Sequence, residues 1–511
     1  MLAKVFSGAV LGVDAYEVEI EDNAGRGQPK VVVVGLPDTA VKESADRVWT
    51  ALLNSAFVPP QGRTTINLAP ADTRKEGPSF DLPIALGVLA ATGDLPAERL
   101  LEFAVVGELA LSGEVRRVRG VLPLALLARE RGRTAIMVPP DNAEEAAVVE
   151  GLAVYPVATL REAADFLAGR VEISPLALDP RDAFSDLSGY EEDFADVKGQ
   201  EYAKRAVEVA VAGGHNLLAI GPPGTGKTML AKRVPSVLPP LSLEEALEVT
   251  KIHSIAGTLP AHQPLVAHRP FRSPHHTISD AGLLGGGTHP MPGEVSLAHH
   301  GVLFLDELPE FHRNVLEVLR QPLEDGQVTI SRAAASVTFP CRFMLVAAMN
   351  PCPCGYAGDL QRECRCSPNQ TARYRSRISG PLLDRIDIHI EVPAVRYQDL
   401  SSLTPGEPSA DIRARVIRAR AIQTERFSGL SRARCNAGMR AKDVHRWCRP
   451  TEAAQHLLKN AISEMHFSAR AYDRILKVAR TIADLDGAAE IGEAHVSESI
   501  QFRMLDRRQW I

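Results

Sequence analysis

Long hydrophobic runs are absent from this sequence. No stretch approaches the roughly eighteen consecutive apolar residues of a membrane-spanning helix, and residues 1–6 lack the apolar core of a signal peptide. Cysteine is scarce too, with 7 residues in a chain of 511. In a cytoplasmic protein such cysteines favour free thiols or metal ligands over disulfides. We therefore expect a soluble, cytoplasmic protein that makes no contact with a membrane.

Strong net charge and a disorder-prone composition are missing as well. Apolar residues make up 45% of the chain and charged residues 23%, which are ordinary values for globular proteins. The net charge of −6 argues against a protein that coats nucleic acid over its whole surface, although it permits a local basic patch. Because 511 residues are too many for one hydrophobic core, we expect about two to four domains.

A glycine-rich phosphate loop at residues 221–228 is the first feature that carries chemistry. It reads GPPGTGKT, follows the apolar run 217–220 and precedes a helical segment. In such a loop, backbone N–H groups surround the phosphates of a nucleotide, the lysine reaches the outer phosphates and the last hydroxyl binds Mg²⁺. An ordinary turn is the alternative for a bare match. The nucleotide-binding candidates are Gly221, Pro222, Pro223, Gly224, Thr225, Gly226, Lys227 and Thr228.

Two further apolar runs end in polar residues. One leads into Asp306 and Glu307, and the other, residues 345–349, leads into Asn350. We predict that Asp306 holds Mg²⁺ together with Thr228, because hydrolysis needs a neutralised phosphate. Glu307 would polarise the attacking water, and Asn350 would orient it. A solvated turn is the alternative for an acidic strand end, but the phosphate loop upstream disfavours it.

Two arginines are candidates for contacts with the γ-phosphate. Arg385 lies in the segment 381–387, and Arg470 lies near the start of a predicted helix. An arginine at that phosphate accelerates hydrolysis by about 10³ to 10⁵. For each of them the alternative is an ordinary surface ion pair.

The chain divides into three parts joined by two connecting segments. In the first part, β-type runs at residues 31–34, 64–68 and 135–138 alternate with helical stretches such as 122–131, whereas the last part shows helical spacing. The predicted fold class is therefore α/β. The predicted divisions are an N-terminal unit at 1–172, a linker at 173–195, an ATPase core at 196–395, a second linker at 396–410 and a helical unit at 411–511.

Two insertions flank the acidic strand end. The first, residues 281–298, is rich in glycine. In the second, residues 328–331 and 336–339 are the predicted arms of a hairpin with Arg332 at its tip. The alternative is a packing hairpin that carries one exposed arginine.

Four of the cysteines crowd into one segment. Two close pairs of thiolates can make a tetrahedral Zn²⁺ site, and such a site stabilises a loop that lacks a hydrophobic core of its own. The Cys-x-Cys spacing is less usual than Cys-x₂-Cys, so ordinary thiols remain the alternative. The zinc candidates are Cys352, Cys354, Cys364 and Cys366. We interpret Cys341, Cys435 and Cys448 as ordinary thiols.

His275 and His276 are adjacent, and neighbouring side chains point in different directions on most backbones. We therefore expect no joint metal site there. Polar contacts near the nucleotide or at a subunit interface are the preferred interpretation.

These motifs, with four further stretches, resemble the ComM/YifB family of magnesium-chelatase-like AAA+ ATPases along essentially the whole chain. The further stretches read RPFRSPHHT (269–277), GGG (285–287), PCPCG (351–355) and ISGPLLDR (378–385). The resemblance implies a hexameric ring with ATP and Mg²⁺ between subunits, an AAA+ core whose insertions project into the pore, and a C-terminal helical lid. It implies that Arg385 acts in trans and Arg470 in cis. It also implies that hydrolysis drives branch migration of recombination intermediates during natural transformation.

The partner implied is single-stranded or branched DNA. Arg332 and the loop 285–289 around Gly286 would grip its backbone from the pore. Residues 411–450 hold eleven Lys or Arg against three acids. Phosphates are an obvious counter-charge for this excess, with Arg415 and Arg418 as candidate contacts. A solvated helix face or subunit contacts explain the excess equally well.

The N-terminal unit resembles a protease domain without its chemistry. Residues 75–79 and 107–115 resemble the nucleophile segment of Lon-type proteases and the strand after it, which implies a Lon-protease-like, S5-like α+β fold. Such a protease needs a lysine to take the proton of the serine. Leu122 stands at that position, and residues 76–197 contain no lysine. We therefore predict that the fold is kept without proteolysis, with Ser79 as a turn or helix N-terminal serine.

The function predicted from the sequence is an ATP-dependent DNA motor, a hexameric branch-migration helicase. One rival is an ATPase subunit that drives metal insertion into a tetrapyrrole. The other is a Lon-like ATP-dependent protease, which the missing lysine disfavours.

Overall fold

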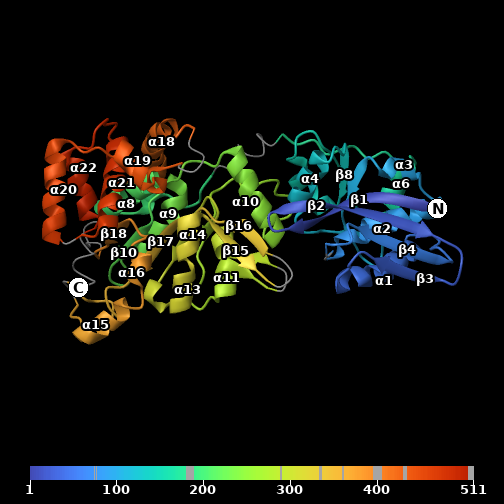
Figure 1. Cartoon of the computed structure of the whole chain (residues 1–511), viewed down its shortest axis with the longest axis horizontal. Coiled ribbons are helices and arrows are strands. Elements are labelled where there is room, and N and C mark those ends of the chain that lie inside the picture. Colours follow the sequence, from blue (N-terminus) through green and yellow to red (C-terminus); the bar gives the residue numbers. More distant parts are fainter. Residues whose placement is uncertain are drawn as a thin grey trace.

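The computed structural model of this chain has two lobes that lie side by side along its long axis (Figure 1). It describes residues 1–73, 75, 77–179, 189–287, 290–332, 336–359, 362–394, 405–429, 434–465 and 467–503. The N-terminal lobe holds one large sheet, and the second lobe holds another. Of the two predicted linkers, residues 180–188 and 396–404 lie outside the described residues.

The N-terminal lobe is built on a seven-stranded mixed sheet in the order β3-β4-β2-β1-β5-β8-β9. β1 and β2 form a long antiparallel hairpin, and β1, β5, β8 and β9 run parallel to one another. The β-type runs predicted at 31–34, 64–68 and 135–138 are strands of this sheet. The strands are β1 (Leu2–Leu11), β2 (Asp14–Ala24), β3 (Lys30–Val34), β4 (Arg63–Ala69), β5 (Phe103–Val105), β8 (Ala135–Val138) and β9 (Ala153–Pro156).

The helices of this lobe complete its core. α2 is apolar on all sides, and its residues from Asp81 to Ala91 are buried, as expected for a helix enclosed by other elements. α4 fills the helical stretch predicted at 122–131. The main helices are α1 (Thr39–Asn54), α2 (Asp81–Thr92), α4 (Val121–Glu130), α5 (Ala143–Ala147) and α6 (Leu160–Leu167).

The second lobe is built on a five-stranded parallel sheet in the order β11-β14-β17-β10-β18. Alternate residues of its central strands pack into two different hydrophobic clusters, so helices and loops cover both faces. This explains why the three motif-bearing strands are continuous apolar runs. The strands are β10 (Leu217–Ile220), β11 (Phe271–Arg272), β14 (Val302–Leu305), β17 (Met344–Met349) and β18 (Ile388–Glu391).

The predicted hairpin is present in the second insertion. β15 (Gln327–Ser331) and β16 (Ser336–Pro340) are antiparallel, and Ser331 pairs with Ser336. The first insertion contains α11 (Asp280–Leu284), β12 (Gly285–Gly286), β13 (Met291–Pro292) and α12 (Glu294–Leu297). The last two residues of the predicted 285–289 loop lie outside the described residues.

The C-terminal part is helical, as its periodicity predicts. α18 packs on α8 (Glu201–Gly213), α9 (Lys227–Val237) and α21, so these helices extend the core of the lobe. They are α18 (Ser409–Arg426), α19 (Ala441–Trp447), α20 (Glu452–Met465), α21 (Ala469–Leu485) and α22 (Glu493–Gln501). Within the described part of the chain, no helix combines the length and apolarity that crossing a membrane requires.

Both ends of the first predicted linker belong to the lobes. Leu176 pairs with Val154 of β9, and Phe194 is fully buried in the second lobe. The carboxylate of Asp193 accepts from the N–H of Ser409 at 3.0 Å. The linker predicted at 173–195 is therefore too long at both ends, because apolar and capping side chains within it pack on the neighbouring units.

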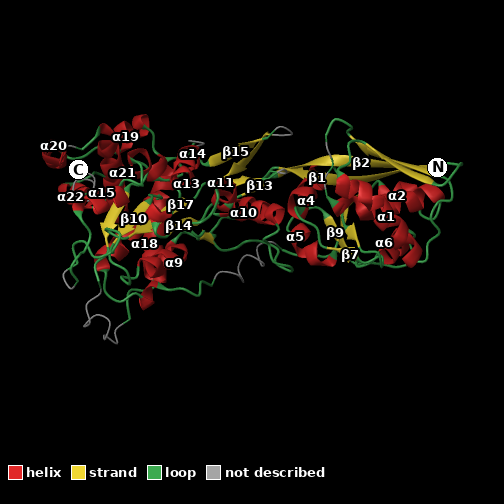
Figure 2. Cartoon of the chain, turned by 90° about the horizontal axis from the view of Figure 1, so that it is seen from below, coloured by secondary structure: helices red, strands yellow, loops and turns green. Residues whose placement is uncertain are grey.

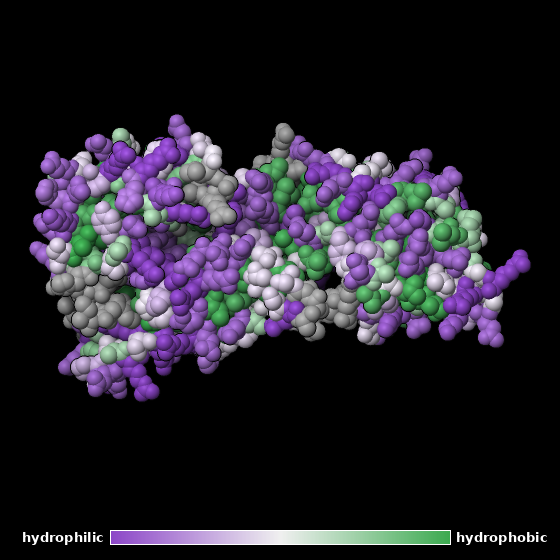
Figure 3. All heavy atoms as spheres, viewed as in Figure 1, coloured by the Kyte–Doolittle hydropathy of each residue, from purple (hydrophilic) through white to green (hydrophobic). Residues whose placement is uncertain are grey.

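The two lobes meet through the N-terminal hairpin and through α10 (Leu243–Ala256). The turn between β1 and β2 approaches the hairpin of the second lobe, as Figure 2 shows, and a Cβ atom at Gly12 would lie 2.7 Å from Cγ1 of Val337. The N–H of Gly120, which precedes α4, donates to the carbonyl of Ser254 in α10 at 3.3 Å. On the face in Figure 3, hydrophilic residues dominate the second lobe, whereas hydrophobic residues are more frequent on the N-terminal lobe.

Candidate active site

The phosphate loop connects β10 to α9. Gly224 and Gly226 have φ values of 78° and 84°, a left-handed conformation that glycine adopts without strain. The ammonium of Lys227 donates to the carbonyls of Gly221 and Pro222 at 2.7 and 2.8 Å. Burial lowers the pKa of Lys227, and the charge of Asp306 opposes this shift. The lysine therefore lies inside the loop that the sequence predicts for phosphates.

Thr228 and Asp306 meet at the carboxyl edge of the sheet. The hydroxyl of Thr228 donates to Oδ2 of Asp306 at 2.7 Å. A hydroxyl and a carboxylate are hard oxygen ligands that suit Mg²⁺, which takes few protein ligands and keeps water and phosphate oxygens as the others. This pair fits the metal role predicted for both residues.

Asn350 lies between the two motifs because β17 separates β10 from β14. Its amide oxygen accepts from the ammonium of Lys227 at 3.2 Å. The structure thus brings together Lys227 and Thr228 from the start of α9 with Asp306 and Asn350 from the ends of two parallel strands. Such an edge can bind a triphosphate, place a metal on it and orient a water molecule.

Glu307 has an unusual backbone conformation. Its φ and ψ are 52° and 46°, a left-handed conformation that is uncommon for residues other than glycine and clusters at functional sites. Its side chain is 54% exposed, and Oε2 lies 3.4 Å from Nδ1 of His276. The carboxylate is therefore turned outward, next to Asp306 but held by a histidine.

The two adjacent histidines do not diverge as expected. The ring centroids of His275 and His276 lie only 4.1 Å apart, because the backbone of this segment is neither helix nor strand. The expectation of different directions is wrong. The preferred interpretation as polar contacts near the nucleotide fits His276, since it reaches Glu307. Sequence reasoning missed this specific role, although the motif 269–277 was the signal that pointed to it.

Arg385 and Arg470 each pair with a carboxylate of their own chain, and no described contact joins either of them to the phosphate loop. Arg385 forms an ion pair with Glu324 of α14 (Arg320–Asp325), and its side chain is 12% exposed. Arg470 is 72% exposed and lies 3.2 Å from the carboxylate of Asp384, the residue before Arg385. This arrangement does not separate the two arginines into one that acts in trans and one that acts in cis.

The two insertions meet at the tip of the hairpin. A Cβ atom at Gly286 would lie 3.5 Å from Nη2 of Arg332, and one at Gly285 would lie 2.8 Å from Cδ1 of Ile330. The hairpin buries Val328 and Ile330 of β15 and Val337 and Phe339 of β16, whereas Gln327, Thr329, Ser331, Ser336 and Thr338 are exposed. On its exposed face, the hydroxyls of Thr329 and Thr338 lie 2.9 Å apart and those of Ser331 and Ser336 lie 3.0 Å apart.

The basic segment is partly an internal network. Arg415 binds Glu407 at 2.5 Å and also pairs with Glu208 of α8, and these two carboxylates raise its pKa. Arg426 pairs with Asp484 of α21 at 2.5 Å. The candidate Arg415 is therefore not a free cation for DNA, because carboxylates from elsewhere in the lobe neutralise it. Arg418 is exposed on α18 and remains available, whereas Arg432 lies outside the described residues.

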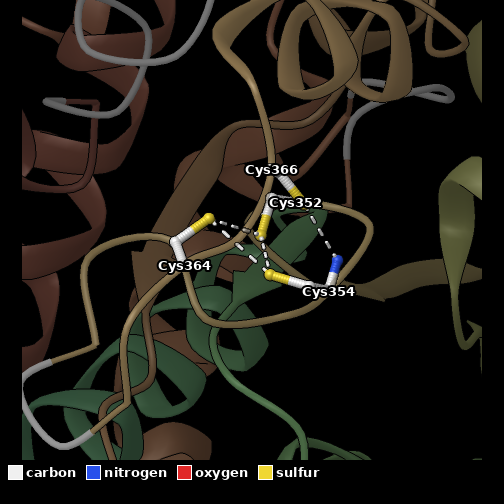
Figure 4. A group of neighbouring side chains, drawn as sticks. All are labelled: Cys352, Cys354, Cys364 and Cys366. Atoms are coloured by element: carbon white, nitrogen blue, oxygen red, sulfur yellow. Dashed lines mark hydrogen bonds between the residues drawn. The ribbon is translucent and has the colours of Figure 1, made fainter.

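The four predicted zinc ligands come together after β17 (Figure 4). The Sγ atom of Cys352 lies 3.3 Å from that of Cys354 and 3.7 Å from that of Cys364. Cys354 and Cys364 are 3.6 Å apart, and the N–H of Cys354 donates to Sγ of Cys366 at 3.4 Å. The other three cysteines are free thiols outside this group, and Cys341 and Cys448 are buried.

The protease-like segment has no serine and lysine pair in the described residues. Ser79 lies in a short 3₁₀ turn (Pro78–Phe80), and Leu122, at the position of the protease lysine, is fully buried in α4. The ammonium of Lys75 donates to the carbonyls of Thr73, at 2.8 Å, and Pro70. No base is therefore offered to Ser79 by these residues.

A parallel sheet with a phosphate loop after β10, an acidic strand end after β14 and a polar strand end after β17 between them defines a phosphate-loop ATPase core of the AAA+ type. Three family models match this chain: "Subunit ChlI of Mg-chelatase" at residues 20–142, "Magnesium chelatase, subunit ChlI" at 193–400 and "Magnesium chelatase, subunit ChlI C-terminal" at 406–503. The chain belongs to the ComM/YifB family of magnesium-chelatase-like AAA+ ATPases, as the similarity to its relatives shows.

Two of these relatives match over nearly their whole length. Competence protein ComM of Haemophilus influenzae is 46% identical, with 99% of this chain and 98% of the relative covered. The uncharacterized protein YifB of Escherichia coli is 45% identical with the same coverage. Lon protease 2 of Bacillus subtilis is 32% identical over 154 residues, which cover 27% of this chain. Membership of the family implies ATP and Mg²⁺ as ligands.

Proposed function

We propose that this chain is an ATP-driven DNA motor that assembles into a hexameric ring and drives branch migration of recombination intermediates. The observation that carries the proposal is the meeting of two insertions at Arg332, in a lobe whose parallel sheet also brings Thr228 and Asp306 together. Family membership adds support, since one full-length relative is named a competence protein. A cytoplasmic location follows from this role.

The chemistry assigned to the site is positioning and charge stabilisation. Lys227 and the loop amides bind the β- and γ-phosphates, and Thr228 and Asp306 hold Mg²⁺. The carboxylate of Glu307 leaves His276 and then takes a proton from the attacking water. Asn350 holds this water in line with the γ-phosphate. His276 therefore restrains the base until a nucleotide draws the carboxylate inward.

We propose a ring of subunits because the described contacts of a single chain bring neither candidate arginine to its own nucleotide site. Arg385 pairs with Glu324 and Arg470 pairs with Asp384, and no described contact joins either arginine to the phosphate loop of the same chain. We assign both to the nucleotide of a neighbouring subunit, where Glu324 would release Arg385 to the γ-phosphate. This revises the cis role that the resemblance implies for Arg470, while the C-terminal helices keep the role of a lid.

The hairpin tip is the proposed grip on DNA. Its exposed face carries hydroxyls and Arg332, which are donors suited to phosphate oxygens, and its apolar face is anchored in the core. A hairpin held in this way transmits movement of the core to a bound strand. Arg418 on α18 would supply a peripheral, positioning contact.

Neither rival function has an observation of its own that favours it over DNA movement. The tetrapyrrole role rests on the description of the family models, which cover a shared ATPase core. Proteolysis lacks a base at Ser79, because Leu122 replaces the lysine and Lys75 is bound to carbonyls.

Arg332→Ala should uncouple hydrolysis from DNA movement. We expect DNA-stimulated ATP hydrolysis to persist while branch migration of a labelled four-way junction slows about tenfold or more, the value of one lost charge-assisted contact. The matched control is Arg418→Ala, which should weaken DNA binding and lower the salt dependence of affinity by about 0.7 to 0.9 in log–log slope. Normal junction movement by Arg332→Ala would show that the hairpin is a packing element.

A further inference from the structure

We propose that Cys352, Cys354, Cys364 and Cys366 bind a single Zn²⁺ ion and that this centre fixes the loop after β17 against the phosphate loop. The ligand atoms of all four cysteines lie within 4.8 Å of one another. They come from the two ends of one segment, so one ion would close it into a knuckle (Figure 4).

The sulfur spacing suits a tetrahedral metal better than a disulfide. With Zn–S bonds of about 2.3 Å, the edge of a tetrahedron of sulfurs is about 3.8 Å. The sulfur–sulfur separations of 3.3, 3.6 and 3.7 Å approach that edge and are far from the S–S bond of about 2.0 Å. Four soft thiolates select zinc over the hard Mg²⁺ of the nucleotide site.

The surroundings also fit a structural metal site. The N–H of Cys354 donates to the sulfur of Cys366, the kind of second-sphere contact that supports metal thiolates. Residues 350–366 contain no helix or strand among those described, and of the four ligands only Cys352 is buried. A loop with so little apolar burial needs another source of order, which a metal supplies.

The position of the cluster links it to ATP hydrolysis. Cys352 follows two residues after Asn350, whose amide oxygen accepts from Lys227. On the other side, a Cβ atom at Gly355 would lie 2.7 Å from Cδ of Pro223 in the phosphate loop. Arg375 of α15 (Pro368–Arg375) donates to the carbonyl of Pro351 at 3.0 Å, which ties the start of the knuckle to the next helix. The knuckle therefore touches the site at both Asn350 and Pro223.

The metal itself is tested by its content in the purified full chain. Elemental analysis should find a single zinc ion per chain, and Co²⁺ exchanged into the site should give the intense charge-transfer absorption of a tetrathiolate. Replacing both Cys364 and Cys366 by serine should remove the zinc, whereas the control Cys435→Ser, a thiol outside the cluster, should keep it. A parent protein without zinc, even after zinc is supplied during expression, would overturn the proposal.

The link to the phosphate loop is tested on the parent protein, so that misfolding of a variant cannot obscure it. A mercurial reagent that titrates thiolates should release zinc, detected with a chromogenic chelator, and ATP hydrolysis should fall about tenfold or more in parallel with that release. Zinc release with unchanged hydrolysis would overturn the link. The link between zinc and hydrolysis rests on the proposed ATPase activity, whereas the zinc content does not. A failure of the zinc proposal can therefore be distinguished from a failure of the proposed function.

Discussion

Glu307→Gln should bind ATP as tightly as the parent and hydrolyse it about 10² to 10⁴ times more slowly, the usual value of a general base. The amide keeps the size of the side chain and its place beside Asp306, but it cannot take a proton from water. Nucleotide affinity by calorimetry and steady-state turnover with Mg²⁺ measure the two effects separately.

Glu310→Gln is the matched control for this experiment. Glu310 lies three residues further along and pairs with Arg377 at 2.8 Å on the surface, so its loss should leave turnover unchanged. Near-normal turnover in Glu307→Gln would remove Glu307 from the mechanism. It would also make the left-handed backbone at this residue a feature of folding alone.

Arg385→Ala should lower turnover by about 10³ or more while nucleotide binding persists, because a γ-phosphate arginine acts mainly on the transition state. If Arg385 completes the site of a neighbour, mixing this variant with Lys227→Ala subunits should restore part of the activity. Recovery is expected only at interfaces where an intact phosphate loop faces an intact Arg385.

Glu324→Gln separates this catalytic role from the ion pair that Arg385 makes within its own chain. The substitution removes the ion pair but leaves the arginine, so it should keep most of the turnover. If Glu324→Gln is as inactive as Arg385→Ala, turnover depends on the ion pair between Glu324 and Arg385 and not on a contact of Arg385 with the γ-phosphate. Failure of mixed rings to recover would favour a role within one subunit.

Strand ends and alternating patterns were predictable because they depend on neighbours in sequence. The continuous apolar runs before Lys227, Asp306 and Asn350 indicate buried parallel strands, and the carboxyl ends of such strands meet at one edge. The hairpin arms predicted at 328–331 and 336–339 lie within β15 and β16. The four cysteines of the predicted zinc site are also close in sequence, and the structure brings their sulfurs together.

Contacts between distant segments were not predictable. The basic segment does not reveal that Glu208, about two hundred residues upstream, neutralises Arg415. The rule that adjacent side chains diverge assumes a regular backbone, which His275 and His276 lack. The order of the motifs also does not reveal that Arg470 pairs with Asp384, because this contact depends on how α21 packs.

The most direct test of the DNA motor is to follow a labelled four-way junction and ATP hydrolysis together, using the full chain with Mg²⁺. We predict that the junction is resolved into its branch-migrated products only with hydrolysable ATP, and that single-stranded or junction DNA accelerates hydrolysis. Active ATP hydrolysis that is indifferent to single-stranded, duplex and junction DNA, with the junction unmoved, would contradict the account.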